Sequence, residues 1–518
     1  MAQLQKFYTN TYRDSVALMQ ISAEISELSG ISQASLIMAT AANIALLNEI
    51  GLIGEFLEPR NNDLLFAAEG DNDEALQLAT SKVEAKLNEV RPGSDSIGLI
   101  SDLPRSIQMG FDQTADSNLA LISCPSEYAT AEALKALKLG LNVMLFSDNV
   151  RIEDEIFLKR EAKKKDLLFM GPDCGTAILN GVPLGFANNV TVGNIGIVAA
   201  SGTGLQQVSC LIDRWGGGIS QAIGTGGRDL SEKVGGTTMI AGIDALSEDT
   251  NTDVIVLISK PPSPEVAMHV LKKATSAGKP VVVNFLGNTL GISVDDPLHE
   301  AKDLEATAYA AIKLAGIEIT PPKRHLVTPE EVTILVNQLP KGRRFLRGLY
   351  TGGTFAYEAM YLLTESLGPL HSATSPTSEY SLKDPWKSLG HTVLDLGNDI
   401  YTRGRPHPMI DHRLRNDRII QEAQDPQTAI ILLDLVLGYG SHSNPAPELA
   451  LTLARADETA KGQGPLVIGF VCGTTKDPQS LEKQKEILSD SGVLLMESNA
   501  QAIRLTADIL SGVSSNGN

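Results

Sequence analysis

The chain has 518 residues, 42% of them hydrophobic, and a formal net charge of −19 from 62 acidic and 43 basic side chains. This length suggests about three domains at roughly 150 residues each. The negative charge argues against nucleic acid or an anionic membrane as a partner. Four cysteines (Cys124, Cys174, Cys210 and Cys472) are widely spaced, without a CxxC pair. This spacing is typical of reduced thiols in the cytosol.

No apolar run approaches the roughly 18 residues of a membrane span. The N-terminus also lacks the apolar core of a signal peptide. We therefore expect a cytosolic protein with no membrane partner.

Short apolar strands alternate with helical patterns along almost the whole chain, which predicts an α/β fold with mostly parallel, doubly wound sheets. Expected strands are 34–39, 63–68, 118–123, 141–146, 167–170, 195–200, 220–223, 253–258, 280–285, 346–350, 392–396, 428–434, 465–471 and 493–496. Expected helices are 14–28, 43–50, 71–90, 127–139 and 151–165, with others after residues 201, 229, 264 and 300. We predict three units over 1–191, 192–320 and 345–513, with a linker over 321–344 that carries a short helix from Pro329.

Two glycine-rich turns lie between an apolar strand and an amphipathic helix. They are Ser201-Gly202-Thr203-Gly204 and Thr351-Gly352-Gly353-Thr354. The backbone N–H groups at the positive end of a helix bind phosphate or carboxylate. The sequence therefore suggests two anion-binding helix ends that face one site; the alternative is a pair of ordinary strand–helix turns.

Other candidates follow or precede strands. Asp173 and Cys174 lie in a tight loop that can line a pocket; Cys174 is either a nucleophile or a small space-filling residue. Arg228, after three glycines in four positions, either clamps a phosphate or carboxylate or is a solvated side chain that pairs with Asp229. Lys260 ends a buried strand before two prolines, as a phosphate-binding cation or as a solvent-facing side chain.

A proline-stiffened loop carries the densest polar cluster: Arg403, Arg405, His407, Asp411 and His412. An arginine here would hold a carboxylate or phosphate, and His407 would move protons near neutral pH. The alternative is an ion-pair loop between subunits or domains. No P-loop, dinucleotide fingerprint, nucleophile elbow or zinc spacing occurs, so no metal site is expected.

Several sequence motifs resemble those of succinyl-CoA synthetase. Gly171-Pro-Asp-Cys, Gly196-Ile-Val-Ala-Ala-Ser-Gly-Thr, Gly224-Thr-Gly-Gly-Arg-Asp and Val254-Ile-Val-Leu-Ile-Ser are similar, in order, to its α subunit. Tyr350-Thr-Gly-Gly-Thr, Leu394-Asp-Leu-Gly and residues 429–438 resemble the carboxy-terminal domain of its β subunit. Over nearly its full length the chain is similar to the FdrA family of acyl-CoA-synthetase-like proteins, through residues 146–150, 170–176, 226–230, 349–354 and 404–411.

The resemblance implies a Rossmann-like CoA-binding-type domain at 1–191 and two flavodoxin-like ligase domains, of α-subunit type at 192–320 and of β-subunit type at 345–513. It implies no ATP-grasp domain. The family's phosphohistidine motif has no counterpart after the strand at 280–285, where His299 is the nearest histidine, and Lys260 aligns with the glutamate that pairs with that histidine. ATP binding is therefore not expected of this chain alone, and CoA is the one cofactor left open.

The resemblance also implies a function in allantoin and purine catabolism, as a subunit of an oxamate carbamoyltransferase that converts oxalurate and phosphate into oxamate and carbamoyl phosphate. On this hypothesis the two turns hold the phosphoryl group and the developing oxyanion. Lys260 and Arg228 neutralise it, Arg405 orients the oxamate carboxylate, and His407 manages the amide proton. The expected partners are small anionic substrates, further protein subunits and a second copy of the chain.

Two alternatives remain open. One is a subunit of an acyl-CoA synthetase, an acid–thiol ligase that borrows ATP-grasp from another chain. The other is a non-catalytic regulatory subunit.

Overall fold

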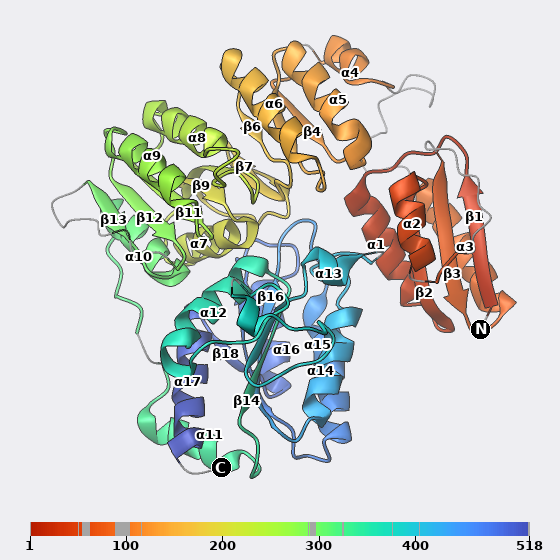
Figure 1. The fold of residues 1–518 in the computed structure, drawn as a ribbon, viewed down its shortest axis with the longest axis vertical. Coiled ribbons are helices and arrows are strands. Elements are labelled where there is room, and N and C mark those ends of the chain that lie inside the picture. The colour runs from red at the N-terminus through yellow and green to blue at the C-terminus, as the bar shows by residue number, and fades with distance from the viewer. Residues whose placement is uncertain are drawn as a thin grey trace. The chain divides into compact units, whose positions relative to one another are not determined.

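The computed structural model describes residues 2–49, 51–53, 63–88, 104–114, 116–287, 290, 297–323, 326–375, 377–403 and 405–515. The chain forms two compact units, Met1–Pro172 with Tyr401–Asp411, and Asp173–Ile400 with His412–Asn518 (Figure 1). The fold is mixed α/β with mostly parallel sheets, which confirms the fold class expected from the alternation of strands and helices. No helix in the described ranges is both long and apolar enough to cross a bilayer.

The first sheet differs from the parallel sheet that the sequence pattern suggests. Its strands are β1 (Ala2–Tyr8), β2 (Ile31–Met38) and β3 (Leu64–Gly70), with helices α1 (Ser15–Ser26), α2 (Ala41–Glu49) and α3 (Asp73–Asn88). The order is β1-β3-β2, and both pairings are antiparallel. In β3, Leu64, Phe66 and Ala68 pack with α1 and α3, whereas Leu65 and Ala67 pack with α2. Because helices cover both faces, residues 64–68 of the strand are all apolar, which is usually a sign of parallel pairing.

The second sheet of the first unit is parallel, as expected. It contains β4 (Leu119–Ile122), β5 (Asn142–Leu145) and β6 (Phe169–Met170), with α4 (Ile107–Gln113), α5 (Ser126–Lys138) and α6 (Ile152–Lys164). Its core combines alanines of α5 with the apolar residues of the strands.

The second unit contains a seven-stranded sheet in the order β13-β12-β11-β9-β10-β7-β8. The strands are β7 (Thr176–Leu179), β8 (Val182–Gly185), β9 (Val192–Ala200), β10 (Ile219–Gly224), β11 (Val254–Ser259), β12 (Val281–Phe285) and β13 (Leu298–Glu300). The helices are α7 (Gly202–Arg214), α8 (Thr237–Glu248), α9 (Pro264–Thr275) and α10 (Leu304–Leu314). Figure 1 shows α8 and α9 on one side of β9, β11 and β12, with α7 and α10 on the other.

The β7–β8 hairpin was not expected from the sequence. Its two strands pair antiparallel, and β7 joins the sheet beside β10. Asn180 and Gly181 connect them, both with positive φ angles of 50° and 76°. Asn-Gly is the strongest short-range hairpin signal, because a type I′ turn needs two residues with positive φ. That signal was therefore present in the sequence. The proposed boundaries at residues 191, 320 and 345 stay a prediction.

The same unit contains a five-stranded parallel sheet in the order β15-β14-β16-β17-β18. The strands are β14 (Phe345–Tyr350), β15 (Thr392–Asp395), β16 (Thr428–Val436), β17 (Leu466–Cys472) and β18 (Leu494–Met496). The helical segments are α11 (Pro329–Gln338), α12 (Gly353–Leu367), η2 (Ser378–Tyr380), α13 (Asp399–Thr402), α14 (Arg413–Gln424), α15 (Pro445–Thr459), α16 (Leu481–Asp490) and α17 (Asn499–Ser515). All five strands were expected within a few residues.

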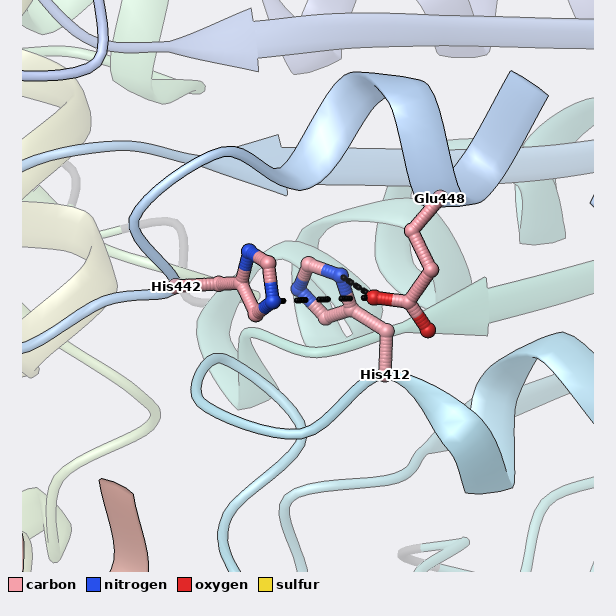
Figure 2. Close-up of side chains that lie close together, drawn as sticks. All are labelled: His412, His442 and Glu448. Atoms are coloured by element: carbon pink, nitrogen blue, oxygen red, sulfur yellow. Dashed lines mark ion pairs between the residues drawn. The ribbon is translucent and has the colours of Figure 1, made fainter. Parts of the chain in front are cut away.

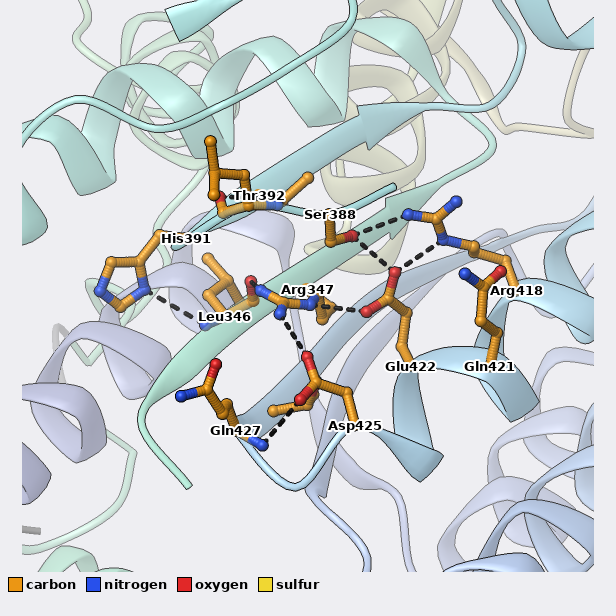
Figure 3. Close-up of polar contacts among 12 residues, drawn as sticks. Leu346, Arg347, Ser388, His391, Thr392, Arg418, Gln421, Glu422, Asp425 and Gln427 are labelled. Atoms are coloured by element: carbon orange, nitrogen blue, oxygen red, sulfur yellow. Dashed lines mark hydrogen bonds and ion pairs between the residues drawn. The ribbon is translucent and has the colours of Figure 1, made fainter. Parts of the chain in front are cut away.

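A buried ion-pair network secures the starting end of this sheet (Figure 3). Glu422 of α14 accepts hydrogen bonds from Arg347 Nε at 2.6 Å and from Arg418 Nε at 2.7 Å. Ser388 Oγ donates to the same carboxylate at 2.5 Å. One buried carboxylate thus joins β14, α14 and the segment that precedes β15.

Replacing Glu422 tests this network. Glu422→Gln leaves the buried guanidinium of Arg418 without its counter-charge and that of Arg347 with Asp425 alone. We therefore expect the free energy of unfolding to fall by about 3–5 kcal/mol. Urea unfolding of the full chain measures the change. Glu458→Gln, on an exposed position of α15, is the control and should change stability by no more than about 0.5 kcal/mol. If the Glu422→Gln protein were as stable as the control, the ion-pair network would not stabilise this sheet.

The buried imidazole of His391, which lies beside this network, should make the stability of the protein depend on pH. Its Nδ1 accepts the N–H of Leu346 at 3.2 Å, and burial, with Arg347 nearby, lowers the pKa of His391 to about 4. The unfolded chain binds this proton below about pH 6.5 and the folded chain does not. The contribution of neutral His391 to the free energy of unfolding is therefore complete above pH 6.5 and is lost as the pH falls towards 4.

His391→Asn keeps an acceptor near the Nδ1 position but cannot titrate. Urea unfolding at pH 7, 5.5 and 4.5 should show a smaller loss of stability on acidification than in the wild type. His269→Asn, exposed on α9, should retain the wild-type dependence. Equal pH dependence of the His391→Asn and wild-type proteins would refute this assignment.

Candidate functional site

Helix α7 begins at the carboxyl end of β9. Ser201 is its N-cap, and the Ser201 Oγ accepts the N–H of Gly204 at 3.0 Å. A Cβ atom on Gly204 would overlap this hydroxyl, so the turn requires glycine at that position. The first N–H groups of a helix have no intrahelical acceptor and lie at its positive end. The turn thus presents donors suited to an anion.

The second turn, at the start of α12, meets the first. The hydroxyls of Ser201 and Thr354 lie 2.7 Å apart in a buried hydrogen bond. A Cβ atom on Gly352 would lie 2.9 Å from the Thr203 Cγ2, so the two turns are in close contact. We refer to residues 201–204 and 351–354 together as the junction. The structure therefore brings together the eight turn residues singled out in the sequence.

Part of the junction is already bound by a carboxylate of the protein. Asp434, near the end of β16, accepts N–H hydrogen bonds from Thr351 at 2.8 Å and from Gly352 at 2.9 Å, and the Thr351 hydroxyl at 2.8 Å. Arg415 Nη1 lies 3.6 Å from the Asp434 carboxylate. Burial raises the pKa of Asp434, while Arg415 opposes the shift. The amides of Thr351 and Gly352 thus shape the turn, and Gly353 and Thr354 begin the helix beyond it.

A second carboxylate and a lysine lie on the other side of the same turn. Asp395 is the last residue of β15, beside Tyr350 of β14. The position of a Cβ atom on Gly353 would overlap Asp395 Oδ2 and lie 3.2 Å from Lys260 Nζ, so these two charged atoms are neighbours. Burial raises the pKa of Asp395, and the charge of Lys260 opposes the shift. Lys260 is exposed, and its amino group lies at the start of α12, where its charge acts on Asp395.

Lys260 reaches this place because of strand order. β11 pairs with β9 so that Ser259 lies beside Ala200, and Lys260 and Ser201 are the next residues of the two strands. β14 is flanked in the same way by β15 and β16, which supply the two aspartates. One sheet thus contributes a cation and the other two carboxylates, at the carboxyl edges where α/β sheets bind ligands.

The remaining candidates of the seven-stranded sheet have mainly structural contacts. Asp229 is buried and accepts the N–H groups of Thr238 at 3.1 Å and Met239 at 2.8 Å, so it caps α8. Cys174 is 1% exposed, and its Sγ lies 3.4 Å from the carbonyl oxygen of Gly224. These contacts favour the space-filling interpretation of Cys174. Asp173 and Arg228 are exposed.

Arg405 and His407 belong to the first compact unit, whereas Lys260 and the junction belong to the second. Gly404, in the same motif, lies outside the described residues. Burial lowers the pKa of His407 to about 4, and its Nδ1 accepts the N–H of Met409 at 3.2 Å. The ring is neutral at pH 7. It is a weaker base than the near-neutral proton carrier expected from the sequence.

His299 lies on the edge strand β13, opposite Val282 of β12. That register is three residues before the carboxyl end of β12 at Phe285, roughly 10 Å along the strand. The family's phosphohistidine, by contrast, follows this strand. The structure therefore gives no support to His299 as a phosphorylated residue.

A histidine–carboxylate cluster was missed in the sequence. His412, His442 and Glu448 come from three segments around the end of β16 (Figure 2). The rings of His412 and His442 have centroids 5.1 Å apart. Burial lowers the pKa of His412 to about 4. The sequence analysis noted His412 only within its polar loop, since its two neighbours are distant along the chain.

Comparison with known proteins identifies the family. The chain is 42% identical over 512 residues to uncharacterized protein YahF of Escherichia coli strain K12, with 97% of each chain covered. Family models match residues 1–98 (AllF, heavy metal-associated domain), 191–287 (CoA binding domain) and 349–509 (CoA-ligase). The chain belongs to the FdrA-like family of the succinyl-CoA synthetase superfamily. This confirms the resemblance found in the sequence motifs and makes the protein acyl-CoA-synthetase-like.

Other known proteins match part of the chain. Succinate–CoA ligase [ADP-forming] subunit alpha 1 of Archaeoglobus fulgidus is 27% identical over 180 residues, which cover 34% of this chain and 60% of that subunit. The dinucleotide forming acetyl-coenzyme A synthetase 1 of Ca. Korarchaeum cryptofilum has 15% sequence identity and a TM-score of 0.30, over 82% of this chain and 89% of that chain.

The heavy metal named by the first family model does not fit the residues of this domain. Soft metal ions bind cysteine thiolates and histidine imidazoles. Residues 1–98 contain neither cysteine nor histidine. We therefore assign no metal to this part of the FdrA-like chain.

Gly353→Ala tests the close packing at the junction. The new Cβ atom would overlap Asp395 Oδ2, so we expect a loss of about 1–3 kcal/mol in the free energy of unfolding. Asp395→Ala removes the obstacle, and the double variant should recover part of that loss in a double-mutant cycle. Gly464→Ala, where the nearest atom to a Cβ lies 3.6 Å away, is the control. Strict additivity of the two substitutions would contradict the packing argument.

Proposed function

We propose that this FdrA-like chain is the subunit of a carbamoyltransferase that converts oxalurate and phosphate into oxamate and carbamoyl phosphate. All four species are small anions or carry a small anionic group. The observation that carries the proposal is the hydrogen bond between Ser201 and Thr354, which joins two helix N-termini beside Lys260. The match of residues 1–98 to the AllF domain model supports a role in the same process as proteins of that name.

The chemistry requires one bond exchange and no nucleotide. An oxygen of phosphate attacks the terminal carbamoyl carbon of oxalurate, and the bond from that carbon to the oxamate nitrogen then breaks. The departing nitrogen takes up the proton that hydrogen phosphate loses. Negative charge grows on the carbamoyl oxygen during attack, and backbone N–H groups at a helix end stabilise such charge. In this proposal the N–H groups at the starts of α7 and α12 bind the phosphate and the oxyanion.

Lys260 has two roles in the proposed site. Without substrate, its positive charge partly neutralises the negative charge of Asp395. With phosphate bound, the lysine neutralises the anion, as a compact cation suits a phosphate group. Arg228, which follows β10 on the other side of β9, is the second candidate cation. Arg405 and His407 belong to the other compact unit, and the proposal does not depend on them.

Phosphorolysis provides the test. Purified chain, alone and with its partner subunits, is given oxalurate and phosphate, and carbamoyl phosphate is assayed. We expect Lys260→Ala to lower kcat/KM by about 10²–10³-fold, the usual effect of removing one stabilising group from a charged transition state.

Lys272→Ala, exposed on α9, is the matched control and should keep full activity. A Lys260→Ala protein with wild-type turnover would remove Lys260 from the mechanism. Absence of turnover in every subunit combination would remove the carbamoyltransferase assignment.

A second candidate is an acyl-CoA ligase subunit. It is favoured by the match of residues 191–287 to a CoA binding domain and of residues 349–509 to CoA-ligase. This alternative requires ATP and CoA, with the nucleotide bound by another chain. Acyl-CoA formation that depends on both, in place of phosphorolysis, would establish it. Binding of phosphate without either reaction would indicate a regulatory subunit.

A further inference from the structure

The cluster of His412, His442 and Glu448 lies outside the residues used by the proposed reaction. His412 directly precedes α14, His442 lies in the loop after β16, and Glu448 is in the first turn of α15 (Figure 2). Helices α14 and α15 pack against each other. The three side chains therefore converge from separate segments of one packed domain.

The distances within the cluster approach those of a metal site. His412 Nδ1 lies 3.6 Å and His442 Nε2 lies 3.7 Å from the same oxygen, Glu448 Oε2. Ligand atoms on tetrahedral Zn²⁺, with bonds of about 2.0–2.2 Å, are roughly 3.3 Å apart. Since all three ligand atoms lie within 4.8 Å of one another, a shift of roughly 1.5 Å at most would close the site.

One polar atom of the cluster, the Nδ1 of His412, has no hydrogen-bond partner in the described part of the chain. His412 is 2% exposed, and its Nδ1 is a buried nitrogen without a hydrogen-bond partner there. A separation of 3.6 Å from the carboxylate is too long for a hydrogen bond. Burying a polar atom without a partner is unfavourable. A cation between the three groups would satisfy this nitrogen and the carboxylate together.

Neighbouring residues orient the carboxylate and balance the charge. Asn416 Nδ2 donates to Glu448 Oε1 at 2.6 Å, which leaves Oε2 turned towards the histidines. Such outer contacts commonly hold metal ligands in place. Arg415, a neighbouring cation, lies 3.6 Å from Asp434, so its charge has its own counter-ion.

Metal binding at His442 would have one local consequence. Its Nδ1 accepts the N–H of Asn444 at 3.1 Å, which puts the proton of a neutral ring on Nε2. Coordination through Nε2 moves the proton to Nδ1 and breaks this contact. Asn444 is exposed, so its N–H can bind water instead.

We propose that His412, His442 and Glu448 bind one divalent first-row transition metal ion, such as Zn²⁺. Two imidazole nitrogens and one carboxylate oxygen are a ligand set preferred by such ions. Three protein ligands leave at least one position open for water or an anionic ligand. The sequence predicted no metal site, because no ligand spacing of a known motif links residues 412, 442 and 448.

Metal titration of the full chain tests the proposal. The protein is dialysed against a chelator and then titrated with ZnCl₂ by calorimetry and with CoCl₂ by visible absorption. We expect one ion per chain, a cobalt spectrum typical of nitrogen and oxygen ligands, and a higher Tm with zinc. Glu448→Gln and His442→Ala should each weaken zinc binding by at least about tenfold.

His269→Ala, exposed on α9, should bind zinc as the wild type does. Circular dichroism checks that each variant is folded. If Glu448→Gln does not fold, the zinc affinity of His442→Ala, which changes a partly buried loop residue, tests the proposal on its own. Wild-type affinity in a folded His442→Ala protein would overturn the proposal. So would the absence of zinc binding by the folded wild-type chain.

Discussion

The hydrogen bond between Ser201 and Thr354 joins the starts of two helices that belong to different sheets. Helix N-termini carry partial positive charge, so two of them in contact repel each other unless negative groups lie nearby. Glycine at position 352 makes the approach feasible, since a Cβ atom there would lie 2.9 Å from the Cγ2 of Thr203 in the other turn. The glycine-rich turns thus serve the packing of the two sheets as well as any ligand that binds there.

Asp395 and Asp434 supply the negative charge. Each lies at the end of a strand next to β14, and together they flank the turn that starts α12. Burial raises the pKa of both, and Lys260 and Arg415 oppose that rise, so the site balances two carboxylates against two cations and two helix dipoles. Such a balance is sensitive to an incoming anion, which would compete with Asp395 for Lys260 and for the helix ends.

Strands and helices followed from the sequence where the signal was local. Residues 254–258 of β11 are all apolar and are followed by Ser-Lys-Pro-Pro, so the extent of the strand and the position of Lys260 after it could be predicted. The antiparallel direction of β1–β3 could not be predicted, because continuous apolar strands occur whenever both faces of a sheet are covered. The contacts of Asp434 with Thr351 and Gly352 also depend on pairing between strands that are 83 residues apart.

The sequence by itself determined the family, the mostly parallel α/β fold and the two turns at the junction, because these depend on short motifs and on local apolar periodicity. Only the tertiary structure decided that the turns touch, that Lys260 lies beside Asp395, and that His412, His442 and Glu448 converge. These depend on strand order and helix packing, which bring together side chains from distant segments. A sequence records the identity of such residues, whereas their distances result from the burial of the whole chain.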